Sequence, residues 1–174
     1  LAAVSGAESS NIGALDALVL YDASALRLLG SDSTTADYSW FFSGFGPEPD
    51  GINADLGDGD AIFTALAQIS TPATVQPGQS LRVTTLRFQA LAPAAGSVIS
   101  LGASLGSFGR TQVLDFYSAG LDITGDISST VSVTVDNTGS AYCFGDGSNG
   151  DCPCGNNGAA GEGCTNSAGT SALL

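Results

Sequence analysis

The chain has 174 residues, of which 17 are acidic and only four are basic, and its formal net charge at pH 7 is −13. This balance excludes a nucleic-acid binder, because too few cations are present to neutralise phosphates, and it argues against docking on anionic lipid. Histidine is absent, which rules out a Ser-His-Asp triad and a His-ligated zinc site. The acidic excess favours cations or basic partners instead.

Apolar runs separated by turn signals predict short β-strands along the first three quarters of the chain. Residues 81–91 alternate well, but the phase shifts at Leu86 and Phe88, which predicts a bulge. Val131, Val133 and Val135 alternate with small polar residues, as in a half-buried strand. The predicted strands are 14–21, 26–29, 38–45, 61–69, 81–91, 98–101, 113–116 and 131–135. So many short strands predict an all-β sandwich, although Ala and Leu content alone would allow helix at 14–29 and 54–68.

The composition changes near residue 136. Residues 1–136 carry the apolar runs, whereas residues 137–174 carry all four cysteines and few large apolar side chains. No run of about 18 apolar residues is present, so we expect no membrane insertion. The chain begins without Met or a signal peptide, and we expect it to be a processed or excised piece of a longer protein. We predict a sandwich over 1–136 and an irregular, disulfide-rich tail over 137–174.

The first part resembles cohesin-like modules. Residues 18–26 form an apolar strand that leads into Tyr21-Asp22, with Ala23 where the family has proline, and residues 76–90 and 131–135 match two further strands. The resemblance implies a nine-stranded, jelly-roll-like sandwich. Cohesin-like modules begin with one or two additional strands, whereas residues 1–13 leave room here for one short strand. We therefore expect an open sheet edge, and open edges pair with other chains.

The tail resembles the Cys-rich motif of large secreted proteins from planctomycetes and some myxobacteria. The residues that carry the resemblance are the four cysteines, a Gly-Asp-Gly at 145–147 and a Cys-Pro-Cys at 152–154. The resemblance implies a secreted protein but no particular activity.

The four cysteines favour disulfides over a Cys₄ zinc site, because no histidine is present and the chain has the composition of a secreted protein. Cys152 and Cys154 are too close in sequence to bridge comfortably. Two pairings remain: Cys143–Cys152 with Cys154–Cys164, or Cys143–Cys154 with Cys152–Cys164. We favour the first, because each of its bridges closes a Gly-rich loop of about ten residues.

An acidic stretch at 48–60 packs carboxylates together with no cation nearby. Calcium would offset their repulsion, because it prefers hard oxygen ligands and glycines let the loop curl around it. A solvated acidic loop explains the stretch equally well, and no EF-hand pattern is present. A second Gly- and Asp-rich stretch lies in the tail. The candidate calcium ligands are Asp50, Asn53, Asp55, Asp58 and Asp60 in the first stretch and Asp146 and Asp151 in the second.

A catalytic site is not expected. Asp55, Asp58 and Asp60 could reach the separation of a glycosidase pair, but so could any Asp-rich loop, and aromatic residues for a sugar cleft are few. No serine or threonine has a histidine or lysine to activate it.

Both ends of the chain are apolar, with Leu1 and Val4 at one end and Leu173 and Leu174 at the other. Frayed ends would explain this, but so would strand exchange, in which an extended end joins the open edge of the next copy. We therefore expect a secreted, non-catalytic subunit that polymerises with copies of itself into an extracellular filament, sheath or surface layer, with Ser and Thr hydroxyls available for O-linked glycans. The alternative is a cohesin-like binding module that recognises a dockerin-like protein or a glycan. For the first reading, we expect deletion of residues 168–174, or of the first seven residues, to abolish assembly and leave the sandwich folded.

Overall fold

The computed structural model describes residues 1–118, 120–127, 130–135, 151–152, 155–160 and 162–170. The chain divides into two units, Leu1–Asp136 and Asn137–Leu174. The strands of the first unit are β1 (Ala2–Val4), β2 (Ser10–Tyr21), β3 (Leu26–Asp32), β4 (Phe42–Gly44), β5 (Asp60–Leu66), β6 (Ala73–Val75), β7 (Ser80–Arg82), β8 (Thr85–Ala90), β9 (Ala94–Gly102), β10 (Ser104–Leu105), β11 (Gly109–Arg110), β12 (Gln112–Asp115) and β13 (Thr130–Val135). Two short 3₁₀ turns, η1 (Ser33–Thr35) and η2 (Ile52–Ala54), are the helical elements of the described residues. The all-β prediction is confirmed.

The larger sheet is built around β2. Its strands run in the order β13-β9-β2-β5-β4, and β6 and β12 also pair with β2, all in antiparallel ladders. β2 can serve as the centre because its run Ala17-Leu18-Val19 is apolar on both faces, and both faces are covered. One face packs on the second layer, and Leu18 on the other face packs against Ile52 and Ile62.

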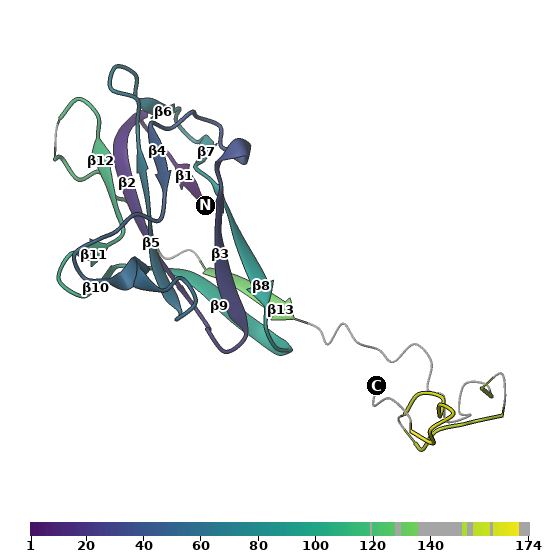
Figure 1. Cartoon of the computed structure of the whole chain (residues 1–174). Helices are drawn as coiled ribbons and strands as arrows, with labels where there is room; N and C mark the ends of the chain where they lie inside the picture. Colours follow the sequence, from purple (N-terminus) through teal and green to yellow (C-terminus); the bar gives the residue numbers. More distant parts are fainter. Residues whose placement is uncertain (119, 128–129, 136–150, 153–154, 161, 171–174) are drawn as a thin grey trace. The chain divides into compact units, whose positions relative to one another are not determined.

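The second layer consists of the pairs β3–β8 and β1–β7. Figure 1 shows β3 and β8 along one side of the first unit, and β2 and β5 along the other. Only Val83 and Thr84 separate β7 from β8, and both are buried. The two layers therefore form a sandwich with the core between them.

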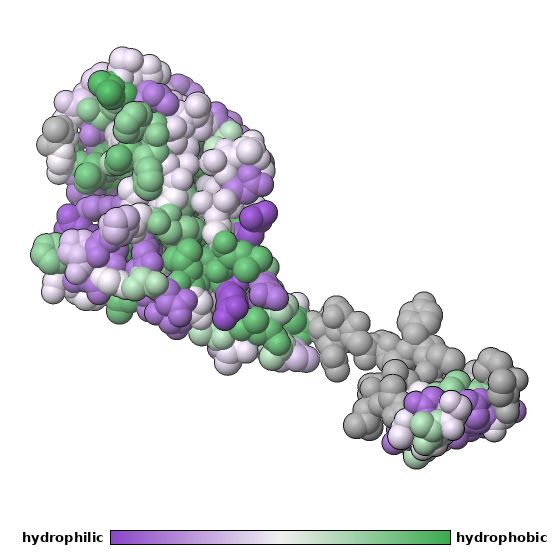
Figure 2. Space-filling model, in the orientation of Figure 1, coloured by the Kyte–Doolittle hydropathy of each residue, from purple (hydrophilic) through white to green (hydrophobic). Residues whose placement is uncertain are grey.

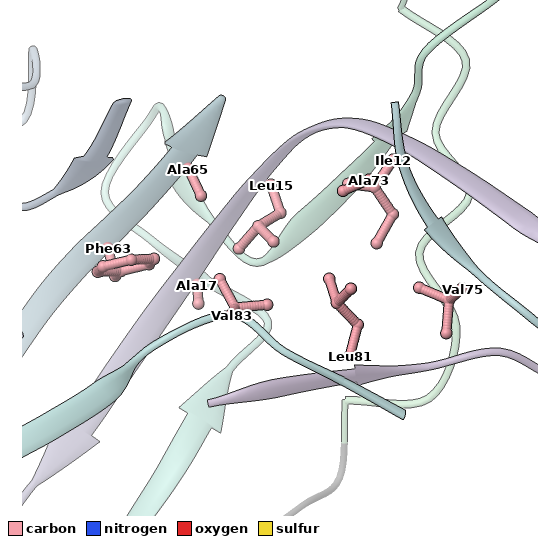
Figure 3. Close-up of a cluster of buried hydrophobic side chains, with 9 residues drawn as sticks. All are labelled: Ile12, Leu15, Ala17, Phe63, Ala65, Ala73, Val75, Leu81 and Val83. Carbon is pink, nitrogen blue, oxygen red and sulfur yellow. The ribbon is translucent and has the colours of Figure 1, made fainter. Parts of the chain in front are cut away.

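The core between the layers contains two clusters. In the first, Leu81 and Val83 lie opposite Ile12, Leu15 and Ala17 of β2 (Figure 3). Phe63 of β5 belongs to the same cluster, is fully buried, and meets the ring of Phe45 edge-on at 5.6 Å. The second cluster joins the far end of β2 to β3 through Val19, Tyr21, Ala25, Leu26, Leu28 and Ala61. The alternating apolar residues of β2 thus hold both ends of the sandwich together.

Several predicted elements differ in detail. Residues 38–45 contribute only the short strand β4, and β6, β10 and β11 were not predicted. β1 is a short strand within residues 1–13, where the sequence leaves room for one. The register does shift at Phe88, but the extra residue is Leu29 in the partner strand β3, so the bulge is not in 81–91. β13 forms as predicted, yet Val131 is 60% exposed and only Val133 and Val135 are half-buried. Alternation in a sequence specifies the strand but not how well the facing layer covers it.

Candidate functional site

β1 is an edge strand with one exposed row of backbone groups. It pairs antiparallel with β7, with Ala3 opposite Leu81. The Leu1 carbonyl accepts from the Val83 N–H at 2.9 Å, and the Ser5 N–H donates to the Gln79 carbonyl at 3.1 Å. Because backbone groups alternate in direction along a strand, those of Ala2 and Val4 point away from β7. Within the described residues no second strand pairs with β1, so it is an edge strand there.

An apolar groove of about 200 Å³ lies beside the open edge. β1 forms part of its lining, and residues 123–127, which follow β12, form another part. Its apolar lining reaches into the first core cluster and includes Ile12, Leu15, Val75, Val83, Val113 and Ile123. At this place the two layers of the sandwich are therefore not closed over each other.

The expected open edge is present, and the structure changes what Leu1 and Val4 do there. Leu1 packs against the first core cluster, its amino group donates to the Thr84 carbonyl at 2.9 Å, and Val4 belongs to β1. The N-terminal end is therefore part of its own sandwich and lines the groove. Leu173 and Leu174 lie outside the described residues. Val113 and Ile123 also line the groove and were not predicted as site residues. An apolar pattern in a sequence does not show at which place the two layers of a sandwich leave a groove between them.

The acidic stretch is organised by hydrogen bonds of its own. The Asp50 carboxylate accepts from the N–H groups of Phe108 and Gly109, at 2.6 and 3.0 Å, and so holds the turn between β10 and β11. The Asn53 side chain donates to the Gly46 and Ile62 carbonyls and accepts from the Ile62 N–H, at 2.7–2.8 Å. Asn53 thereby forms hydrogen bonds with the backbone of β5, as a neighbouring strand would. Two of the predicted calcium ligands, Asp50 and Asn53, therefore stabilise the fold through hydrogen bonds.

The remaining predicted ligands do not converge. Asp55 accepts from the Gly57 N–H at 2.7 Å, and Asp151, in the second unit, accepts from the Asn157 side chain at 3.0 Å. Burial raises the pKa of Asp60, and the nearby charges of Asp58 and Glu48 raise it further. Among the residues that the structure describes, no three acidic, histidine or cysteine side chains are grouped so that they could hold a metal ion. Asp146 lies outside those residues.

We expect the unfolding temperature to fall as the pH is lowered below about 4, with Asp50 as one contributor. The Phe108 and Gly109 amides hold the pKa of Asp50 below the ordinary value of 3.8. A carboxyl group with a depressed pKa stabilises the fold above its unfolded pKa and loses that contribution as the pH falls through the folded value. Asp22, Asp32 and Asp122 act in the same direction through hydrogen bonds from Ser24, Thr34 and Thr124, whereas Asp60 opposes them.

Thermal unfolding of Asp50→Asn between pH 2 and 7 checks this. The variant should unfold at a lower temperature at pH 7 and lose less stability on acidification. An acid profile parallel to that of the unaltered chain would contradict the role given to the Asp50 charge.

A second apolar surface lies at the β4 edge of the larger sheet. Phe42 pairs with Leu66, and both are more than one-third exposed. Phe41 is 63% exposed and Ile69 is 87% exposed. Figure 2 shows hydrophobic side chains at the surface in the region where Figure 1 places β2, β4 and β6. Such gathered exposure is typical of a contact surface.

The second unit is joined by a disulfide between Cys152 and Cys164, with an S–S distance of 2.02 Å. This bond excludes the favoured pairing, Cys143–Cys152 with Cys154–Cys164. Two hydrogen bonds form next to this bridge. The Cys152 N–H donates to the Asn157 side chain at 2.9 Å, and the Thr165 N–H donates to the Asn156 carbonyl at 2.8 Å. These contacts fold the chain back and bring Cys164 to Cys152, which loop length alone could not predict. Cys143 and Cys154 lie outside the described residues.

Replacing both Cys152 and Cys164 by serine should loosen the second unit and leave the first intact. The bridge closes a short loop and, by restricting the unfolded chain, stabilises the second unit by about 2–3 kcal/mol. The core clusters, in contrast, lie wholly within residues 1–136. Limited proteolysis should then cut residues 151–170 faster, while the thermal midpoint of the first unit stays the same. A lowered midpoint would contradict this separation.

Comparison with protein families and with curated proteins gives no match to this chain. In the described residues no helix is both long and apolar enough to cross a membrane.

Proposed function

We propose that this chain is a secreted, non-catalytic structural subunit that assembles head-to-tail into an extracellular filament, sheath or surface layer by β-strand complementation. The observation that carries the proposal is the open edge of β1 beside a groove that leads into the core. A strand from a neighbour would gain backbone hydrogen bonds along the edge and bury apolar side chains in the groove. A contact between two different surfaces of identical copies builds a filament when the rotation from one copy to the next does not close into a ring.

Two further features support an extracellular setting. The Cys152–Cys164 disulfide is of the kind that persists in oxidising compartments. The surplus of acidic over basic residues keeps single copies soluble before assembly, and Ser and Thr hydroxyls offer sites for O-linked glycans. The cohesin-like, jelly-roll character of the first unit belongs to the same proposal.

Electron microscopy of the purified full chain over a range of concentrations tests the assembly. Regular fibres or sheets are the expected result, together with a sedimentation coefficient that rises with concentration. Dispersed monomers at every concentration would overturn the proposal.

The exposed apolar residues at the β4 edge favour a second function, a binding module for a dockerin-like protein or a glycan. Such a module would stay monomeric alone and change size only when a second species is added. Phe41→Ser with Ile69→Ser should then abolish binding of that species, whereas these changes leave the β1 edge untouched.

Calcium enters the proposal as a bridge between copies. Asp58 and Asp60 repel one another, and the described residues contain no complete set of ligands, so a neighbour would supply the remaining oxygens. Calcium at about 10⁻³ M, where weak extracellular sites bind, should then lengthen the fibres. Asp58→Asn with Asp60→Asn should abolish that lengthening. If a chelator and this double variant both leave fibre length unchanged, the calcium bridge is wrong, while strand complementation stands.

A further inference from the structure

We infer that the strand received by the groove is the segment 170–174 of a second copy, with one of its two leucines supplying the side chain that fills the groove. This inference rests on the proposed function and names the donor. The juxtaposition behind it is a largely aliphatic groove beside an N-terminal strand that is already paired with β7, in a chain that carries a second apolar segment at 170–174.

The N-terminal residues are not available as the donated strand, because they are already paired within their own sandwich. β1 is hydrogen-bonded to β7 in register from Ala2 to Val4, and the Leu1 carbonyl accepts from Val83. Withdrawing these residues to donate them elsewhere would break that ladder and uncover the first core cluster. This cost falls on residues 1–4, so we assign the donated strand to the other apolar segment, residues 170–174.

The chemistry of the segment matches that of the groove. Leu173 and Leu174 are the only large aliphatic residues in 137–174. The groove lining contains Leu, Ile and Val and no aromatic side chain. A cavity of about 150 Å³ holds a benzene ring, so a groove of about 200 Å³ has room for a leucine side chain and a smaller neighbour. Side chains alternate along a strand, so one leucine would enter the groove together with the small residue two positions before it, Ser171 for Leu173 or Ala172 for Leu174. The other leucine would point away from the groove.

The edge of β1 supplies the matching backbone contacts. Ala2 and Val4 each present an N–H and a carbonyl away from β7. Val4 is 74% exposed, so its side chain leaves the approach to this edge open. A short segment is sufficient because the edge is itself short, with Ala2–Val4 as its full length.

The test uses the full chain with Leu173→Asp and Leu174→Asp as the receptor, since it can accept a strand but not donate one. The probe is a labelled synthetic peptide of residues 165–174, and the matched control is the same peptide with both leucines changed to aspartate. We expect the first peptide to bind, with amide NMR shifts at Ala2, Val4 and Ile123. The control peptide should bind at least about tenfold more weakly, because a buried leucine is lost.

A second pair of variants tests the edge. Val4→Pro in the receptor removes the Val4 N–H, which points away from β7, and leaves the hydrogen bonds of the β1–β7 ladder in place. Val4→Ala keeps this N–H and is the matched control. Binding should weaken with Val4→Pro and persist with Val4→Ala. Equal binding by both peptides, or fibres of the double Asp variant like those of the unaltered chain, would overturn the donor assignment while leaving a filament subunit. If the unaltered chain stays monomeric and does not bind the peptide, whereas the double Asp variant does, the segment binds the groove of its own chain. The assignment of the donor to a second copy is then wrong, and the filament proposal fails with it.

Discussion

Phe63→Ala should destabilise the first unit by about 3–5 kcal/mol and lower its unfolding temperature by more than about 10 °C. Phe63 is fully buried in the first core cluster, where its ring meets that of Phe45. Truncation removes this contact and leaves a cavity in the core next to β5, which its ladder with β2 prevents from moving in to fill the space. Chemical denaturation followed by circular dichroism measures the change.

The matched control is Phe108→Ala. The Phe108 side chain is 69% exposed, and its backbone N–H, which donates to Asp50, is kept in the variant. Its free energy of unfolding should change by less than about 0.5 kcal/mol. Equal losses in the two variants would show that the core is not where this structure places it.

Deleting residues 1–4 should also destabilise the sandwich, by about 3 kcal/mol or more. The deletion removes the whole of β1, the hydrogen bonds from the Leu1 amino group to Thr84 and from Val83 to the Leu1 carbonyl, and the packing of Leu1 and Ala3 on the first cluster. Each net hydrogen bond contributes about 1 kcal/mol, and the newly exposed core adds to the loss. The structure thus reverses the expectation that the N-terminal end is dispensable for folding.

Deleting residues 171–174 is the control for this experiment. It should leave the unfolding temperature of the first unit unchanged, because β13 ends at Val135 and the core clusters lie before it. Differential scanning calorimetry compares the two truncations. A first unit that unfolds at the same temperature without residues 1–4 would contradict the place of β1 in the sandwich.

The sequence predicts the long, apolar strands and misses the short ones. β2 and β5 have enough apolar residues in period to be recognised, and their antiparallel pairing builds the larger sheet. β1 and β6 have three residues each, too few for a period, and they become strands only because β7 and β2 lie beside them. Short edge strands are a consequence of tertiary structure and carry little local signal.

The candidate site shows the same limit. An open edge was expected from the short N-terminal segment, yet the groove beside it depends on how β12 pairs with β2. For the acidic stretch, the sequence leaves two explanations open, a calcium site and a solvated acidic loop. Instead, Asp50 and Asn53 use backbone N–H and carbonyl groups that are far from them in sequence or hidden in β5, which no local pattern displays.

The central position of β2 has a consequence for how this molecule opens. Its amides are shared among ladders to β5, β9, β6 and β12, so they exchange with solvent only when several ladders break together. Among the described residues, the amides of β1 pair only with β7 and exchange through a local opening of far lower free energy. The β1–β7 ladder can therefore open locally while the ladders around β2 stay closed. In the proposed assembly, a subunit would then receive a strand at this edge without unfolding.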